Sequence, residues 1–184
     1  MTIKTEDSGP AAGGSGAFLQ SFWDLAASNT TKRRAAAGRI ISHLHETLKG
    51  EDSDEQGSIT PDITYAVKRL VRGLGSNREA ARQGFGACLA EVLASIPVVD
   101  ANEVLDQILK ETATRAKMRG SEEKDALLGR LFGLGALLRS GRLAADEGAW
   151  ARALGELAAL HRKKPWLREA VADALLGLLR QAPG

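Results

Sequence analysis

The chain has 184 residues, with 25 lysine and arginine side chains against 23 aspartate and glutamate side chains, and its net charge of +2 provides no global field that would draw it onto nucleic acid. Hydrophobic residues make up 43% and exclude wholesale disorder, while an aromatic content of only 4% favours helices over strands. The single cysteine, Cys88, excludes an internal disulfide and a cysteine-based zinc site.

The N-terminal segment, residues 1–17, is predicted to be a disordered tail. It is rich in glycine, alanine and serine, and with Glu6 and Asp7 it lacks the apolar stretch of a signal peptide. The longest strongly apolar run of the chain, Leu131 to Leu138, falls far short of the roughly 20 residues that a membrane-spanning helix needs. We therefore expect no membrane association.

Four stretches of the sequence resemble one another at an ungapped offset of 45 residues. In each, apolar residues recur at steps of three and four, which is typical of a helix with one buried face. The stretches begin at Arg33, Arg78, Glu123 and Arg168, and two aligned columns are apolar throughout: Ala36, Ala81, Ala126 and Val171, then Leu44, Leu89, Leu134 and Leu179. A third column holds Ile40, Phe85 and Leu175 and is interrupted by Arg130.

A shorter apolar pattern precedes each stretch and predicts a partner helix. These patterns cover residues 18–26, 63–74, 105–112 and 150–160, with turns at 28–31, 74–77, 119–121 and 163–165. Eight helices in four hairpins with a 45-residue period predict an all-α fold, a HEAT- or armadillo-like α-solenoid over residues 18–182. A compact all-α bundle with accidental sequence matches is the alternative.

Polar residues mark several of the predicted helix starts. Ser76 with Glu79 forms the pattern of a capping box, and Thr31 and Ser121 occupy the same repeat position as Ser76. We therefore predict N-caps at these three positions.

Two further features concern the connections and the packing. Residues 50–60 carry four carboxylates and are predicted to form a mobile acidic loop, after which Thr60–Pro61 starts the next helix. Gly129, Gly133 and Gly135 lie inside a predicted helix, where each costs about 1 kcal/mol relative to alanine. We expect these glycines to permit close approach of a neighbouring helix.

The sequence contains no convincing catalytic or metal-binding constellation. His43 and His45 are two residues apart and point to different sides of a helix, and His161 stands alone, so no metal or cofactor is predicted. Cys88 lies on an apolar face and is interpreted as a core residue. The carboxylates sit in first turns or on polar faces and form no isolated acid–base pair: Glu79, Glu122, Glu123, Asp146, Glu147 and Glu169.

Two basic clusters are the candidate binding residues. The first comprises Lys68, Arg69, Arg72, Arg78 and Arg82, and the second comprises Arg162, Lys163, Lys164 and Arg168, with Trp166 among them. Three interpretations remain open for both clusters: a solvated helix face, contact with the phosphates of DNA or RNA, or pairing with an acidic protein surface. Trp166 is expected to pack against the preceding turn rather than to stack on a base.

Several of these stretches resemble the DNA polymerase phi family, also known as the Myb-binding protein 1A family. The most specific block is YAVKRLVRGLGSNREAARQGF at 65–85. FWDLAAS at 22–28 with RRAAAGRII at 33–41, GRLFGLGALLRSGRL at 129–143 and KKPWLREAVADALLGLL at 163–179 resemble the family in the same order. The resemblance covers roughly residues 18–180. Family members are much longer, so the resemblance implies that this chain is the N-terminal part of a longer solenoid.

The resemblance also implies a function. It suggests a non-enzymatic scaffold of the nucleus and nucleolus in ribosomal RNA transcription, ribosome biogenesis and transcription regulation. The expected partners are transcription or ribosome-assembly factors, with DNA or RNA bound through the basic clusters. One alternative is a DNA polymerase, as the family name suggests, although two-metal catalysis needs positioned carboxylates, normally on strands, that the sequence does not predict. The other is a generic HEAT-like adaptor without a nucleic-acid role.

Overall fold

The computed structural model describes residues 16–50 and 59–183, and within these ranges it contains eight α-helices and no strand. The predicted all-α fold is therefore confirmed. The helices are α1 (Gly16–Asp24), α2 (Thr30–Gly50), α3 (Pro61–Leu74), α4 (Glu79–Ser95), α5 (Ala101–Glu111), α6 (Gly120–Arg139), α7 (Glu147–Lys163) and α8 (Arg168–Leu179). Two short 3-10 helices, Arg142–Ala145 and Pro165–Leu167, precede α7 and α8.

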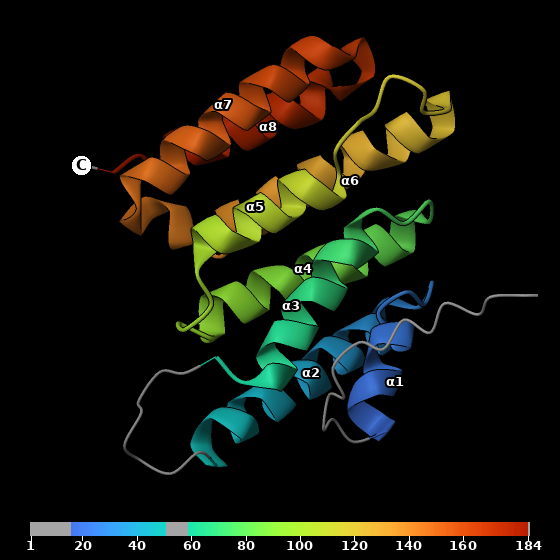
Figure 1. The fold of residues 1–184 in the computed structure, drawn as a ribbon, viewed down its shortest axis with the longest axis vertical. Helices are drawn as coiled ribbons and strands as arrows, with labels where there is room; N and C mark the ends of the chain where they lie inside the picture. Colours follow the sequence, from blue (N-terminus) through green and yellow to red (C-terminus); the bar gives the residue numbers. More distant parts are fainter. Residues whose placement is uncertain (1–15, 51–58, 184) are drawn as a thin grey trace, which may run out of the picture.

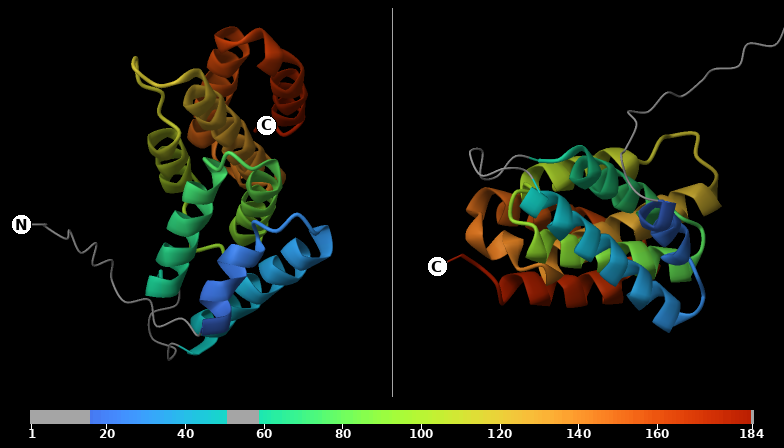
Figure 2. Two further views of the ribbon diagram at one scale, coloured as in Figure 1. Left: turned by 90° about the vertical axis from the view of Figure 1, so that its right-hand side faces the viewer. Right: turned by 90° about the horizontal axis from the view of Figure 1, so that it is seen from below.

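The helices stack as four consecutive pairs in two layers. Odd-numbered helices form the front layer and even-numbered helices the back layer in Figure 1, and every extensive helix contact joins members of the same pair or of adjacent pairs. Figure 2 shows the same succession from the side and from below. The turns within pairs lie along one edge, and the links α4–α5 and α6–α7 lie along the opposite edge. This arrangement is consistent with an α-solenoid.

The aligned sequence columns occupy comparable places in the first three pairs. Ala36, Ala81, Ala126 and Val171 are all buried, and so are Leu44, Leu89 and Leu134. Leu179 differs, because its side chain is 53% exposed on α8, which packs only on α6, α7 and the 3-10 turn before it. The even-numbered helices begin at residues 30, 79, 120 and 168, which are 49, 41 and 48 residues apart, so the element boundaries do not keep a uniform offset.

Arg130, the residue that interrupts the third column, connects α6 to α5 and to α7. Its guanidinium donates to the backbone carbonyl of Thr112 at 3.1 Å and pairs with the carboxylate of Glu156 at 3.1 Å. Thr112 is fully buried at the end of α5, and Glu156 lies on α7. A charged side chain is tolerated at this position because its donors find acceptors on both sides.

Two of the three glycines predicted to permit close approach do so. A Cβ atom on Gly129 would lie 2.8 Å from the carbonyl oxygen of Leu74, and one on Gly133 would lie 2.7 Å from a side-chain carbon of Ile108. Gly135 meets only the guanidinium of Arg139 on its own helix. The front helices α3 and α5 can therefore approach α6 because two positions on it carry no side chain.

The predicted start of α3 is confirmed. The hydroxyl of Thr60 accepts the amide hydrogen of Ile63 at 3.2 Å, and Pro61 is the first helical residue. The predicted capping box of Ser76 and Glu79 is wrong, because α4 begins at Glu79 itself and the hydroxyl of Ser76 accepts from the amide of Arg78.

The other two predicted N-caps are also wrong. Thr31 and Ser121 both lie inside their helices, which begin one residue earlier. The side chain of Asn29 accepts from the amide of Lys32 at the start of α2, and the carboxylate of Glu122 accepts from the amide of Arg119 at the start of α6. The cap is thus set by the residue at which the helix actually starts, not by the repeat position.

The predicted tail and loop fall mostly outside the described residues. Helix α1 begins at Gly16, two residues inside the predicted tail 1–17, and the hydroxyl of Ser21 bonds to the carbonyl of Ala17. Of the predicted acidic loop, Gly50 belongs to α2, and only residues 59 and 60 of the remainder are described. None of the helices in the described ranges has the length and apolar character needed to cross a bilayer.

Candidate nucleic-acid interface

In the first predicted basic cluster, some side chains are exposed to solvent and one contacts a ring of α1. Lys68 and Arg72 are exposed on α3, where Arg72 lies 3.8 Å from the carboxylate of Glu111. The guanidinium of Arg69 sits 5.6 Å from the centre of the Trp23 ring, a cation–π distance, and Trp23 remains 68% exposed.

Arg78 and Arg82, which belong to the same predicted cluster, connect neighbouring helix pairs. Arg78 donates to the carbonyl of Ala26 at 2.7 Å, so it joins the second pair to the turn of the first. Arg82 is only 7% exposed and donates to the carbonyl of Ser76 and to the carboxylate of Asp125 at 3.2 Å on α6. Charge-assisted bonds of this kind hold the arginine in place, so Arg82 could reach a phosphate only by breaking them.

The second predicted cluster lies at the turn between α7 and α8. Lys163 and Arg168 are exposed, and the ammonium of Lys164 pairs with Glu123 of α6 at 2.8 Å. The Trp166 ring is 47% exposed, and the ammonium of Lys124 lies 6.0 Å from its centre. The Trp166 ring is thus more exposed to solvent than we would expect if it packed against the preceding turn.

A third basic cluster, which the sequence interpretation missed, lies in the turn between α5 and α6. Arg115, Lys117 and Arg119 are all exposed, and the thioether sulfur of Met118 accepts the amide hydrogen of Arg115 at 3.2 Å. Within the described parts of the chain none of these three side chains forms an ion pair. The signal was present in the sequence, because residues 112–121 contain three cations and no acid.

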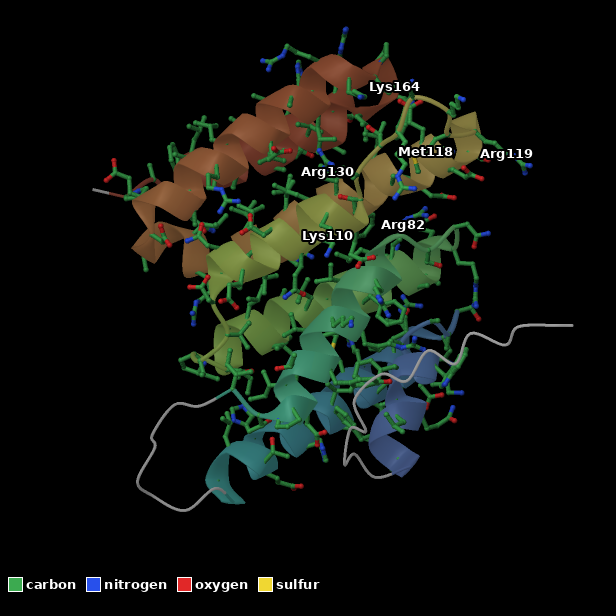
Figure 3. All side chains as sticks on the ribbon, viewed as in Figure 1. Arg82, Lys110, Met118, Arg119, Arg130 and Lys164 are labelled. Carbon is green, nitrogen blue, oxygen red and sulfur yellow. The ribbon has the colours of Figure 1, made fainter. Side chains whose placement is uncertain are left out.

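These clusters share one side of the molecule, because the turns within all pairs lie along the same edge (Figure 1). Figure 3 shows Arg119 pointing outward from the α5–α6 turn on the side where Lys164 also lies. We call this surface the turn edge. It comprises Arg72, Arg115, Lys117, Arg119, Lys163, Lys164 and Arg168 together with the exposed rings of Trp23 and Trp166.

Carboxylates also lie near the turn edge, and several of them have a partner, whereas the exposed Glu169 of α8 has none within the described residues. Glu111 and Glu123 pair with Arg72 and Lys164, and Asp125 pairs with Arg82. Glu79 accepts from the side-chain amide of Gln83 at 3.0 Å. Exposed ion pairs are weak, but their opposite charges cancel. The net positive charge of the surface therefore comes from the cations with no carboxylate partner.

Two of the residues considered for catalysis or metal binding, His43 and Cys88, have structural roles. His43 lies 2.7 Å from the Asp62 carboxylate and stacks on Phe18 with the ring centres 4.1 Å apart. The Cys88 side chain is fully buried in the core, as predicted, and burial raises the pKa of its thiol to about 12. Across the ranges that the structure describes, no three histidine, cysteine or acidic side chains gather to hold a metal ion.

Comparison with known proteins identifies a family and regulatory relatives. The sequence profile of the family described as DNA polymerase phi matches residues 65–184. Myb-binding protein 1A of Mus musculus is 32% identical over 166 residues, covering 90% of this chain and 12% of that protein. The rDNA transcriptional regulator pol5 of Schizosaccharomyces pombe is 30% identical over 168 residues, covering 90% of this chain and 16% of that protein.

The match therefore concerns a small part of much longer relatives. The chain spans 12% of the mouse protein and 16% of the fission yeast protein. No solved structure matches the chain significantly.

Proposed function

The chain belongs to the DNA polymerase phi family, and we propose that it is a non-enzymatic scaffold of the nucleus and nucleolus in ribosomal RNA transcription and ribosome biogenesis. The names of its relatives support this role, because they describe an rDNA transcriptional regulator and a Myb-binding protein rather than a catalyst. The succession of helix pairs with extensive contacts only to adjacent pairs supports a HEAT- or armadillo-like repeat.

Within this role, the turn edge is proposed to bind single-stranded nucleic acid. The observation that carries the proposal is the α5–α6 turn, where Arg115, Lys117 and Arg119 are exposed and need break no ion pair to meet a phosphate. Basic side chains from the second and fourth pairs flank this turn on the same edge. Binding of this kind gains its free energy from released counterions and is therefore sensitive to salt.

The two exposed indole rings favour single strands over duplexes. Trp23 and Trp166 are 68% and 47% exposed, and each has a cation near its ring. Unpaired bases stack on such rings with little sequence preference, whereas the bases of a duplex are already stacked on one another. The expected ligand is thus a single strand bound without strong sequence selectivity.

A salt series with labelled polyuridine tests the proposal. The double variant Arg115→Ser/Lys117→Ser should lower the slope of log affinity against log salt by about 1.4, roughly 0.7 for each lost phosphate contact on a single strand. The matched control Lys49→Ser/Arg180→Ser removes the same charge from exposed positions at the ends of α2 and α8 and should leave the slope unchanged. Equal losses in both variants, or no binding by the unaltered chain, would contradict the proposal.

A further inference from the structure

A groove of about 620 Å³ runs between α2 and α4 on the layer of even-numbered helices. Its walls are formed by residues of both helices, and Arg139 of α6 stands at one end. We call it the α2–α4 groove. It shares no residue with the turn edge, so it needs a separate explanation.

The groove exists because small residues face each other across the two helices. Ala37 and Gly38 line it from α2, and Ala87, Ala90 and Ala94 line it from α4. A Cβ atom on Gly38 would meet no other atom within 4 Å, so the space beside this glycine is open.

The next interface along the same layer is filled. Between α4 and α6, a Cβ atom on Gly86 would lie 3.4 Å from the ring of Phe132. No comparable aromatic side chain lines the α2–α4 groove. The open space is therefore a feature of this interface and not of the layer as a whole.

The charges along the groove are unbalanced. Arg33, Arg34 and Arg139 line it together with a single acid, Glu91. Arg33 is engaged, because it donates to the carbonyls of Ala27 and Ser28 and to the side chain of Gln83.

Arg34 and Arg139 are exposed cations of the groove. Within the described residues, neither guanidinium has a hydrogen-bond or ion-pair partner on the protein. Burial lowers the pKa of Arg139, so part of its hydration has been removed without an anion to replace it. A carboxylate beside Arg139 would replace part of the hydration that burial has removed, and one beside the exposed Arg34 would form an ordinary surface ion pair.

We propose that the α2–α4 groove binds an acidic amphipathic helix of a partner protein. Its apolar stripe would lie on the alanines and on Ile41, and its carboxylates would meet Arg34 and Arg139. The alanine and glycine walls allow a helix backbone to approach closely. The α4 wall from Gln83 to Ala94 is about 16 Å long at 1.5 Å per residue, enough for roughly three helical turns.

A nucleic acid fits the groove less well than an acidic helix. Phosphates could meet the two arginines, but the apolar floor would leave the sugars and the other phosphates of the strand without partners. An amphipathic partner helix can satisfy both features at once. Its apolar side chains, at steps of three and four, face the apolar floor, while charged side chains beside this stripe reach the arginines.

A designed peptide provides the test. The probe is a labelled, stapled helix of roughly 16 residues, with leucine and alanine on one stripe and glutamate elsewhere. A second probe carries lysine in place of glutamate. The unaltered chain should bind the glutamate peptide at least about tenfold more tightly than the lysine peptide. Absence of binding, or equal binding of both, would overturn the proposal.

Variants of the groove then locate the binding. Arg34→Glu/Arg139→Glu should reverse the preference, so that the lysine peptide becomes the tighter ligand. Lys49→Glu/Arg180→Glu carries the same change of net charge at positions outside the groove and should keep the original preference. Ala87→Trp should fill the floor and weaken the glutamate peptide about tenfold, with an unchanged circular dichroism spectrum. Failure of the reversal, or undiminished binding by Ala87→Trp, would count against the groove.

The two proposals can fail separately. Arg115→Ser/Lys117→Ser should bind the glutamate peptide as the unaltered chain does, because neither residue lines the groove. If Arg34→Glu/Arg139→Glu abolishes polyuridine binding and leaves the glutamate peptide unaffected, these arginines serve nucleic acid and the groove proposal is wrong.

Discussion

Single arginines illustrate how one residue type takes different roles in this molecule. Arg119 is exposed at a turn, Arg69 lies over an indole ring, and Arg82 is buried between helix pairs. In the sequence, Arg69 and Arg82 belong to the same basic cluster. The difference arises from groups remote in sequence, such as Asp125, which lies 43 residues after Arg82.

Loss of the Arg82 side chain should destabilise the protein strongly. Arg82→Ala leaves Asp125 without its partner in a site where the two side chains are 8% and 26% exposed, and we expect the free energy of unfolding to fall by about 3 kcal/mol. Urea denaturation measures this. The exposed Lys68→Ala serves as the control and should change stability by less than about 0.5 kcal/mol. A comparably small loss for Arg82→Ala would show that the bridge contributes little.

The thiol of Cys88 should be unreactive in the native protein. The side chain is fully buried and its pKa is raised to about 12, mainly by desolvation, so a thiol reagent at pH 8 should label it only after denaturation. Because the folded state holds this proton more tightly, the associated stability is complete below the ordinary pKa of 9.0 and is lost as the pH rises towards 12. Rapid labelling without denaturant would contradict the burial.

At the scale of elements, the apolar period of the sequence predicted the helices well, because burial of one face repeats every few residues along the chain. The starts of α2, α4 and α6 could not be predicted in the same way. An N-cap depends on the residue at which the backbone enters the helix, and α4 begins only at Glu79, three residues after Ser76. The cations of the α5–α6 turn alternate with Ala116 and Met118 and form no consecutive basic run, so they are less conspicuous in the sequence than the basic run at 162–164.

A matched pair of glycine substitutions tests the packing of α4 against the first helix pair. A Cβ atom on Gly84 would lie 2.0 Å from the carbonyl oxygen of Leu25, so Gly84→Ala must displace backbone and should cost about 3 kcal/mol. Gly38→Ala meets nothing within 4 Å and should stabilise α2 by up to about 1 kcal/mol through helix propensity. Thermal denaturation of the two variants compares them directly, and similar midpoints would refute the assigned close contact.

At the scale of the whole molecule, the stack has interior pairs and end pairs. Helices α3 to α6 have neighbours on both sides, whereas α8 leaves Leu176 and Leu179 more than half exposed. The number of helices and their pairing could be predicted from the repeats, and so could solvent exposure on the last helix, but which of its leucines are exposed could not. Leu178 is fully buried next to these two leucines, and its backbone carbonyl accepts the indole hydrogen of Trp150.

Amide hydrogen exchange should reveal this difference between pairs. Because stability in such a stack is carried by contacts between neighbours, the amides of α3 to α6 should exchange most slowly and those of α1 and α8 fastest. Mass spectrometry of peptic fragments resolves the helices individually. Equal protection of all four pairs would mean that the molecule unfolds as one cooperative unit.

The α2–α4 groove also has a mechanical consequence. Each interface between consecutive helix pairs acts as a joint, and these joints are connected in series. Their compliances therefore add, and the least packed joints contribute most to the elastic deformation of the stack. On the even-numbered layer the contacts between α2 and α4 and between α6 and α8 are both much less extensive than that between α4 and α6. Tension or torque along the stack should therefore strain the first and third joints before the second. A helix seated in the groove would stiffen the first joint and so set the angle at which the first pair meets the others.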